Sequence, residues 1–131
     1  MKNEVAIIFF VDRSLGKTHV VKALREIGES VEAHDDHFDR AEADSVWLQA
    51  VAARDWVVLT ADKRIAYRRL ERMAIEQARA KVFVLVSGNL SGPEMAAIFA
   101  KAVTAIKRFT WQTAAPFIAK VYKDGRVKAW K

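Results

Sequence analysis

Three aspartates lie next to predicted strands or at a predicted helix start, where acidic side chains can converge. Asp12 directly follows the apolar run 5–11, Asp62 comes shortly after the apolar run 56–59, and Asp44 opens a predicted helix. Carboxylates from separate strand ends repel one another and raise each other's pKa unless a cation compensates. Mg²⁺ and Mn²⁺ prefer oxygen ligands of this kind and keep waters for substrate phosphates. The three aspartates therefore indicate a divalent-metal site that could activate water for phosphoryl displacement.

Each aspartate also has a purely structural interpretation. Asp44 and Asp62 stand at predicted helix starts, where a carboxylate can accept hydrogen bonds from free backbone N–H groups. Asp12 is harder to explain by packing, because a buried apolar strand has no structural need for an aspartate at its end. Both interpretations stay open for Asp44 and Asp62, whereas a functional one is favoured for Asp12.

The elements that must position these residues alternate between strand and helix. The predicted strands are 5–11, 30–33, 56–59 and 81–86. Four helices are predicted: one over 14–27, one starting at 44, one over 63–78 and one starting after Ser91. Ser14 is the expected cap of the first. The last is marked by a capping box and a proline in its first turn. Two alternating segments, 117–122 and 126–130, flank Asp124-Gly125 and predict a hairpin.

This order of elements predicts an α/β fold with three layers. The central sheet is expected to be mostly parallel and covered on both faces, with an antiparallel hairpin at the C-terminal end. At 131 residues the chain is expected to be a single domain over 1–131. In such sheets, ligands bind at the carboxyl ends of the strands, which is where the three aspartates are predicted to lie.

The composition excludes several classes of protein. The chain is 52% hydrophobic and 29% charged, so it is not expected to be disordered. It has no cysteine, which excludes disulfides and thiolate metal sites and fits a reducing cytoplasm. Its longest apolar run, 5–11, is far shorter than a membrane span, so we expect a cytoplasmic protein without membrane association.

The charges are unevenly distributed along the chain. Residues 26–44 hold eight acids and one base, and residues 63–81 hold seven bases and two acids. An acidic pocket beside basic flanks suits a polyanion that meets metal ions, although solubilising surface charge is the alternative. The residues expected to contact a nucleic-acid backbone are Arg13, Lys63, Arg64 and Arg68.

Two other motifs are set aside. Gly16-Lys17-Thr18 resembles the end of a phosphate-binding P-loop, but Val11 stands where the first glycine is required. His34-Asp35-Asp36-His37 does not have a recognised zinc-ligand spacing. We expect a solvated acidic loop there, from which Asp35 or Asp36 could reach the rim of the main site.

Several segments together resemble the PIN-like domains of VapC-type toxins. They are FFVDRSLG at 9–16, HDDHF at 34–38, Asp44 followed by WL at 47–48, WVVLTADKRI at 56–65 and VFVLVSGNLSG at 82–92. The resemblance covers at least residues 9–106. It implies a Mg²⁺- or Mn²⁺-dependent endoribonuclease, the toxin of a toxin–antitoxin pair, whose acids hold metal and orient water against an RNA phosphodiester.

The resemblance also assigns residues and partners. Asp12, Asp44 and Asp62 match the acidic site, and Glu42 competes with Asp44 at the same helix start. Many family members have a fourth acid, which this chain lacks near Asp62. The secondary candidates are therefore Asp35, Asp36, Glu42 and Asn89. A cognate antitoxin and a homodimer are expected as partners.

Two competing functions remain at this point. The chain could be a catalytically silent PIN-like module that binds RNA or protein, marked by salt-sensitive RNA binding without metal. A phospho-acceptor signalling domain would need a hydroxyl and a lysine on later strands, and Ser87 and Lys120 are the candidates. Arg13 after Asp12 and a lysine placed in the hairpin argue against it.

Overall fold

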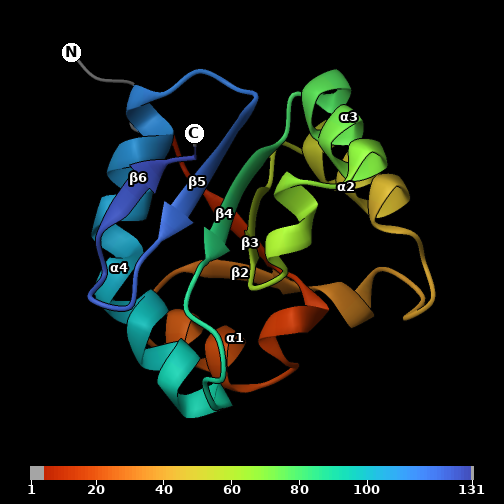
Figure 1. The fold of residues 1–131 in the computed structure, drawn as a ribbon. Helices are drawn as coiled ribbons and strands as arrows, with labels where there is room; N and C mark the ends of the chain where they lie inside the picture. The colour runs from red at the N-terminus through yellow and green to blue at the C-terminus, as the bar shows by residue number, and fades with distance from the viewer. Residues whose placement is uncertain (1–4, 131) are drawn as a thin grey trace.

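Short apolar strands form the centre of the molecule, and the computed structural model describes them within residues 5–130. They make one six-stranded sheet in the order β2-β1-β3-β4-β5-β6 (Figure 1). The strands are β1 Ile8–Val11, β2 Ser30–Ala33, β3 Val57–Thr60, β4 Lys81–Leu85, β5 Phe117–Val121 and β6 Val127–Ala129. All neighbours are parallel except β5 and β6. The predicted α/β class, mostly parallel sheet and terminal hairpin are confirmed.

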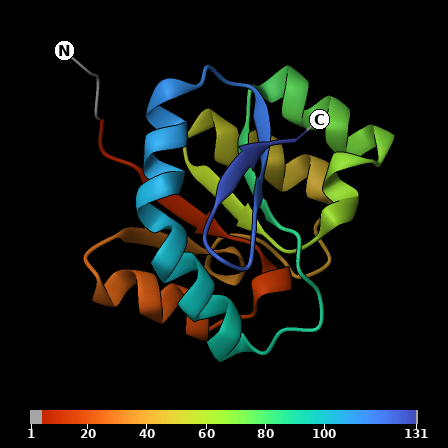
Figure 2. The same ribbon diagram turned by 60° about the vertical axis from the view of Figure 1, so that its left-hand side comes forward.

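Helices cover both faces of the sheet. They are α1 His19–Glu26, α2 Asp44–Ala53, α3 Arg69–Ala78 and α4 Gly92–Gln112, with the short 3₁₀ helices η1 Arg13–Leu15, η2 His34–Asp36 and η3 Lys63–Ala66. Figure 2 shows α1 and α4 on one side of the sheet and α2 and α3 on the other. Within residues 5–130, no helix combines the length and the apolar character that a bilayer crossing requires.

Two separate hydrophobic cores follow from strand alternation. Successive side chains of a strand point to opposite faces, so Phe9 and Val11 pack toward α1 and α4 while Phe10 packs toward α2 and α3. All three are essentially inaccessible to solvent. The central strands are therefore apolar on both faces, which is why the sequence shows them as continuous apolar runs.

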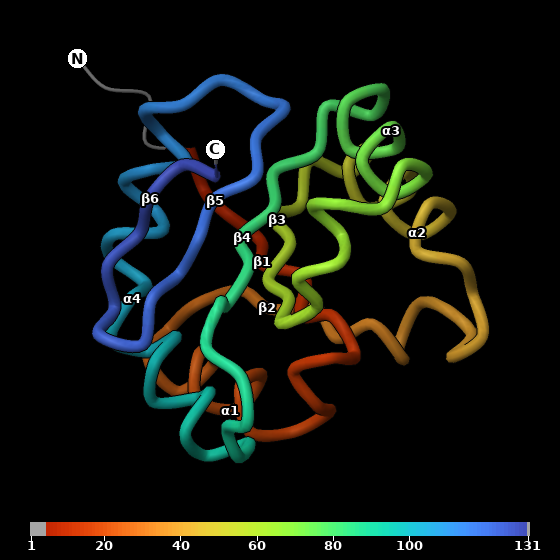
Figure 3. The backbone as a smooth tube through the Cα atoms, in the orientation of Figure 1, coloured from red at the N-terminus to blue at the C-terminus, as the bar shows by residue number. Residues whose placement is uncertain are grey.

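The register aligns the ends of the first three strands. Val11 at the end of β1 pairs with Ala33 of β2 and with Leu59 of β3. The carboxyl ends of β1, β2 and β3 therefore lie together on the same side of the sheet, as the tube in Figure 3 shows. Residues that follow these strands are brought together although they are far apart in sequence.

The structure moves the start of two predicted elements further along the chain. Strand β1 begins at Ile8 rather than at residue 5, and Val5 is 57% exposed. The predicted helix 14–27 begins only at His19, because Ser14 lies in η1 and bonds to the side chain of Asp12 instead of capping.

The predicted helix 63–78 is broken into η3 and α3. Its first turn is 3₁₀, and Arg68 has an extended conformation before α3 begins. The other predicted helix starts are close to those observed. The capping box before α4 forms as expected, with the Glu94 N–H donating to Ser91 Oγ and the Ser91 N–H donating to Glu94 Oε1.

Candidate active site

One cavity contains all three aspartates singled out from the sequence. It has a volume of about 240 Å³ and lies where the chain leaves β1 and β3. Its lining residues are Asp12, Arg13, Ser14, Asp44, Asp62 and Arg64. Asp12 and Asp62 follow the carboxyl ends of β1 and β3, where ligands bind in such sheets, and Asp44 joins them from the start of α2.

Asp12 is held firmly in this cavity. Its backbone N–H donates to the Leu59 carbonyl at 3.0 Å, and the residue is 8% exposed. Its Oδ2 accepts two hydroxyl hydrogen bonds, from Thr60 Oγ1 at 2.7 Å and from Ser14 Oγ at 2.8 Å. Within residues 5–130, Oδ1 accepts no hydrogen bond. One carboxylate oxygen is therefore fixed and the other is free to bind a ligand.

Two hydroxyl residues that the sequence interpretation missed connect the strand ends. Thr60 is fully buried, and its Oγ1 also accepts the Asp62 N–H at 3.0 Å. Ser14 Oγ accepts the Ala61 N–H at 2.8 Å. The signal that could have identified Thr60 is a hydroxyl residue ending an otherwise apolar strand. These bonds fix Asp12 and the segment that carries Asp62 relative to each other.

Asp44 occupies the first turn of α2 without capping it. The N-cap is Ala43, and Asp44 Oδ1 instead accepts a hydrogen bond from Trp47 Nε1 at 2.9 Å. Burial raises the pKa of the Asp44 carboxyl, and the Trp47 hydrogen bond opposes this. The negative charges of Asp12, Asp62 and Glu71 raise the pKa further. The capping interpretation is therefore wrong for Asp44, whose surroundings favour a compensating cation.

Asp62 does cap a helix, which is the structural function that the sequence left open for it. Its Oδ1 caps η3 by accepting the Arg64 N–H at 3.1 Å, and the Arg64 Nε–H donates to the same oxygen at 3.0 Å. The Asp62 side chain is 19% exposed, whereas that of Arg64 is 66% exposed. An ion pair to such an exposed partner is weak, so Arg64 can leave Asp62 at little cost.

Glu71 adds a fourth acid that sequence reasoning did not identify. It lies in the first turn of α3, its side chain is 14% exposed, and it is 4.0 Å from Arg68 Nη1. Its charge contributes to the raised pKa of both Asp44 and Arg64, although it does not line the cavity. It was hidden in the sequence because its neighbours are mostly basic.

The donor set suits a hard divalent cation. Asp12, Asp44 and Asp62 offer only oxygen, which is what Mg²⁺ and Mn²⁺ select. Across residues 5–130, no three acidic or histidine side chains are close enough to ligate one ion as they stand. Arg64 currently supplies positive charge beside Asp62. The carboxylates are gathered, and binding an ion would require them to move closer together.

The secondary candidates lie outside this cavity. Asp35 and Asp36 line an adjacent space of about 130 Å³, which shares only Arg13 with the carboxylate cavity. A hydrogen bond from His34 lowers the pKa of Asp35, burial opposes this, and Lys17 and Arg13 lower it further. Glu42 does not line the carboxylate cavity, and neither does Asn89, which sits in the loop after β4.

The expected solvated loop after β2 is partly wrong. His34 is only 2% exposed and packs among the rings of Phe10, Phe38 and Trp47. Its Nδ1 lies 2.9 Å from Asp35 Oδ1, while His37 Nε2 lies 2.7 Å from Glu32 Oε1. The two histidines therefore have separate carboxylate partners.

The four expected backbone-binding cations are at or near the cavity. Arg13 and Arg64 line it, with side chains 40% and 66% exposed. Lys63 is exposed beside Arg64, and the Arg68 side chain is 50% exposed. All four are accessible to a polyanion approaching the carboxylates.

Comparisons of the sequence with known proteins relate the chain to one family. The sequence model of a family described as "PIN like domain" matches residues 7–87, which include Asp12, Asp44 and Asp62. A Mycobacterium tuberculosis protein named "Putative ribonuclease VapC45" is 28% identical over 123 residues, which span 91% of this chain and 88% of that protein. No solved structure matches the chain significantly. The resemblance inferred from the motifs is confirmed.

Proposed function

The chain belongs to the PIN-like domain family, and on that premise we propose that it is a metal-dependent endoribonuclease. The observation that carries the proposal is the convergence of Asp12, Asp44 and Asp62 on one cavity, next to exposed arginines. Acidic residues alone would repel an RNA phosphate. Carboxylates combined with a divalent cation and basic flanks would attract it.

Some residues of the cavity would bind the metal and others would bind the substrate. Mg²⁺ or Mn²⁺ bound by Asp12, Asp44 and Asp62 would supply Lewis acidity and a more acidic bound water. Ser14 and Thr60 hold Asp12 Oδ2, so the carboxylate keeps one orientation as a ligand arrives. Arg13 and Arg64 line the same cavity and would bind phosphates next to the scissile bond.

The proposed biological setting is based on the name of the relative. Because that protein is called a ribonuclease of the VapC series, we propose that this chain is a toxin with an RNA substrate and a cognate antitoxin. We propose the cytoplasm as its location and a homodimer as its assembly. The antitoxin would act by covering the carboxylate cavity.

A catalytically silent RNA- or protein-binding module is the second candidate. Two observations favour it. Arg64 donates a hydrogen bond to Asp62, and within residues 5–130 no three acidic or histidine side chains lie close enough together to ligate one ion. Such a module would keep its basic surface and bind RNA with strong salt dependence.

Purified protein incubated with total RNA in Mg²⁺, in Mn²⁺ or in EDTA tests the proposal. Asp12→Asn removes one charge and should reduce cleavage by orders of magnitude. Asp55→Asn is the matched control, because Asp55 lies at the opposite end of β3, is paired with Lys81 at 2.9 Å and has a φ of 60° that asparagine tolerates.

Cleavage by the wild type and by Asp55→Asn, abolished by EDTA and by Asp12→Asn, would support the nuclease. Equal thermal stability of the three proteins excludes misfolding as the cause. RNA binding without cleavage by any of them would favour the silent module instead.

A further inference from the structure

An exposed tyrosine, Tyr67, lies close to the carboxylate cavity along the chain. Tyr67 directly follows η3, which begins one residue after Asp62, and its N–H donates to the Arg64 carbonyl at 2.9 Å. A 3₁₀ helix rises about 2.0 Å per residue, so Tyr67 is about 10 Å from Asp62 along this path. At a stacked rise of about 3.4 Å per nucleotide, that distance corresponds to about three nucleotides.

The second ring comes from the C-terminal hairpin. Trp130 follows β6, and its N–H donates to the Ile118 carbonyl at 2.9 Å, which fixes its backbone to β5. The rings of Tyr67 and Trp130 meet edge to face, with centroids 5.7 Å apart. Segments that are distant in sequence thus place two aromatic side chains together beside η3.

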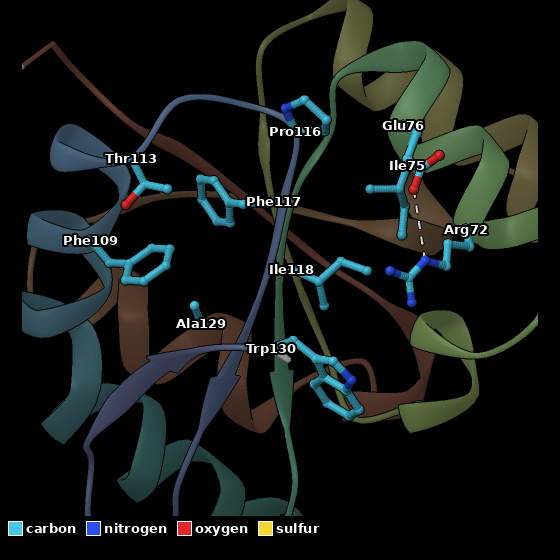
Figure 4. Close-up of a pocket in the computed structure, with 10 residues that line it drawn as sticks. All are labelled: Arg72, Ile75, Glu76, Phe109, Thr113, Pro116, Phe117, Ile118, Ala129 and Trp130. Carbon is cyan, nitrogen blue, oxygen red and sulfur yellow. Dashed lines mark ion pairs between the residues drawn. The ribbon is translucent and has the colours of Figure 1, made fainter.

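Tyr67 is accessible to solvent, whereas Trp130 is partly buried against the core and borders a cavity. Tyr67 is 69% exposed, which is unusual for so large a side chain. Trp130 lines a cavity of about 300 Å³, and Figure 4 shows its indole near Ile118 and the guanidinium of Arg72. This volume is at the small end of the range for ligand cavities. This volume is large enough for a planar ring system.

Positive charge surrounds the two rings. Lys120 Nζ lies 5.2 Å from the centre of the Trp130 ring, and Arg72 faces the cavity while paired with Glu76 at 3.7 Å. Arg68, next to Tyr67, has a side chain that is 50% exposed. Aromatic faces with flanking cations are the combination that binds single-stranded nucleic acid, because bases stack while phosphates meet the cations.

We infer that Tyr67 and Trp130 form a stacking platform for an unpaired base of the RNA strand whose scissile phosphate lies at Asp12, Asp44 and Asp62. The inference rests on the proposed function and specifies its substrate as single-stranded RNA at this point. Stacking accepts any base, so the platform adds affinity and sets the position of the strand without selecting a sequence.

Binding measured in EDTA tests the platform separately from cleavage. Fluorescence anisotropy with an unstructured, labelled oligoribonucleotide of about a dozen residues gives Kd for the wild type, Tyr67→Ala and Trp130→Ala. Loss of one stacked base should raise Kd about 5- to 150-fold. Tyr67→Phe should restore most of the affinity, because it keeps the ring.

Two control variants isolate the contribution of the rings. Leu70 is as exposed as Tyr67, at 69%, but has no ring, so Leu70→Ala should bind like the wild type. Trp111 also has a lysine over its ring, with Lys107 Nζ at 5.8 Å, but its indole N–H donates to Val5 ahead of β1. Trp111→Ala should therefore leave Kd unchanged.

An oligonucleotide with abasic positions provides the decisive comparison. It should bind the wild type and Tyr67→Ala almost equally, because the base that stacks is missing. If Trp130→Ala unfolds the hairpin, Tyr67→Ala still tests the platform, since so exposed a side chain contributes little to folding.

Normal RNA affinity in both alanine variants would overturn the platform. The aromatic surface, with Leu70 and Met73 beside it, would then be assigned to a protein partner. Failure of the wild type to bind any RNA would contradict the proposed function as well, so the two failures can be told apart.

Discussion

The Thr60 hydroxyl donates a 2.7 Å hydrogen bond to Oδ2 of Asp12 across 48 residues of sequence. The same hydroxyl accepts the backbone N–H of Asp62 at 3.0 Å. A single buried side chain therefore connects two of the three carboxylate-bearing segments. Since outer-shell partners orient metal ligands, Thr60 should affect both stability and activity.

Replacement of Thr60 by valine should reduce cleavage about 10- to 100-fold, as expected for the loss of an outer-shell partner. It should also lower the free energy of unfolding by about 1–3 kcal/mol, because buried polar partners lose their hydrogen bond. Cleavage rates and urea unfolding measure the two effects. Thr110→Val is the control, because Thr110 is also buried but donates to Ile106 within α4. Equal cleavage by the two variants would contradict the positioning function of Thr60.

The stability of Asp44→Asn should depend on pH in a direction set by burial. In the folded protein the pKa of Asp44 is raised above 3.8, so its ionised form costs stability once the pH exceeds that value. In EDTA, Asp44→Asn should therefore be more stable than the wild type at neutral pH and lose this advantage as the pH falls below 3.8. Urea unfolding at several pH values measures the difference.

Asp124→Asn should change the stability at neutral pH in the opposite direction to Asp44→Asn. Hydrogen bonds from the backbone and side chain of Arg126 lower the pKa of Asp124, so its ionised form stabilises the fold. Removing that charge should reduce stability at neutral pH. If both variants changed the stability at neutral pH in the same direction, burial would not be what sets the pKa of Asp44.

Added Mg²⁺ or Mn²⁺ should raise the unfolding temperature of the wild type. A ligand that binds the folded state at a hundredfold excess over its Kd adds about 2.7 kcal/mol of stability. Asp12→Asn should show a much smaller shift, while Asp55→Asn should match the wild type. Thermal unfolding with increasing cation measures this without any RNA. Identical shifts in all three proteins would place the cation elsewhere.

Arg64→Ala should separate metal binding from RNA binding. Its guanidinium is hydrogen-bonded to Asp62, so its removal takes a competing positive charge away from that carboxylate and should strengthen cation binding. The same change should weaken RNA binding and reduce the slope of log K against log salt by about 1. Arg108→Ala is the control, because Arg108 is an exposed arginine on α4 that does not line the carboxylate cavity. If the salt dependence of RNA binding were unaltered in Arg64→Ala, Arg64 would not contact the RNA.

Local sequence signals were enough to predict most of the elements. Continuous apolar runs identified the buried central strands, because a strand covered on both faces must be apolar at successive positions. The Ser91 capping box identified the start of α4, because it involves residues only three apart. The strand-end rule grouped Asp12 with Asp62, and the family match includes both.

The tertiary structure decided what depended on contacts between distant segments. Ser14 was expected to cap a helix, but a hydrogen bond to Asp12 and proximity to Thr60, 46 residues away, hold it in η1. The helix after Asp62 breaks at Arg68, and this turns Tyr67 toward Trp130. Periodicity describes a helix or strand in isolation, whereas these arrangements exist only because the folded sheet brings separate chain segments into hydrogen-bonding or packing distance.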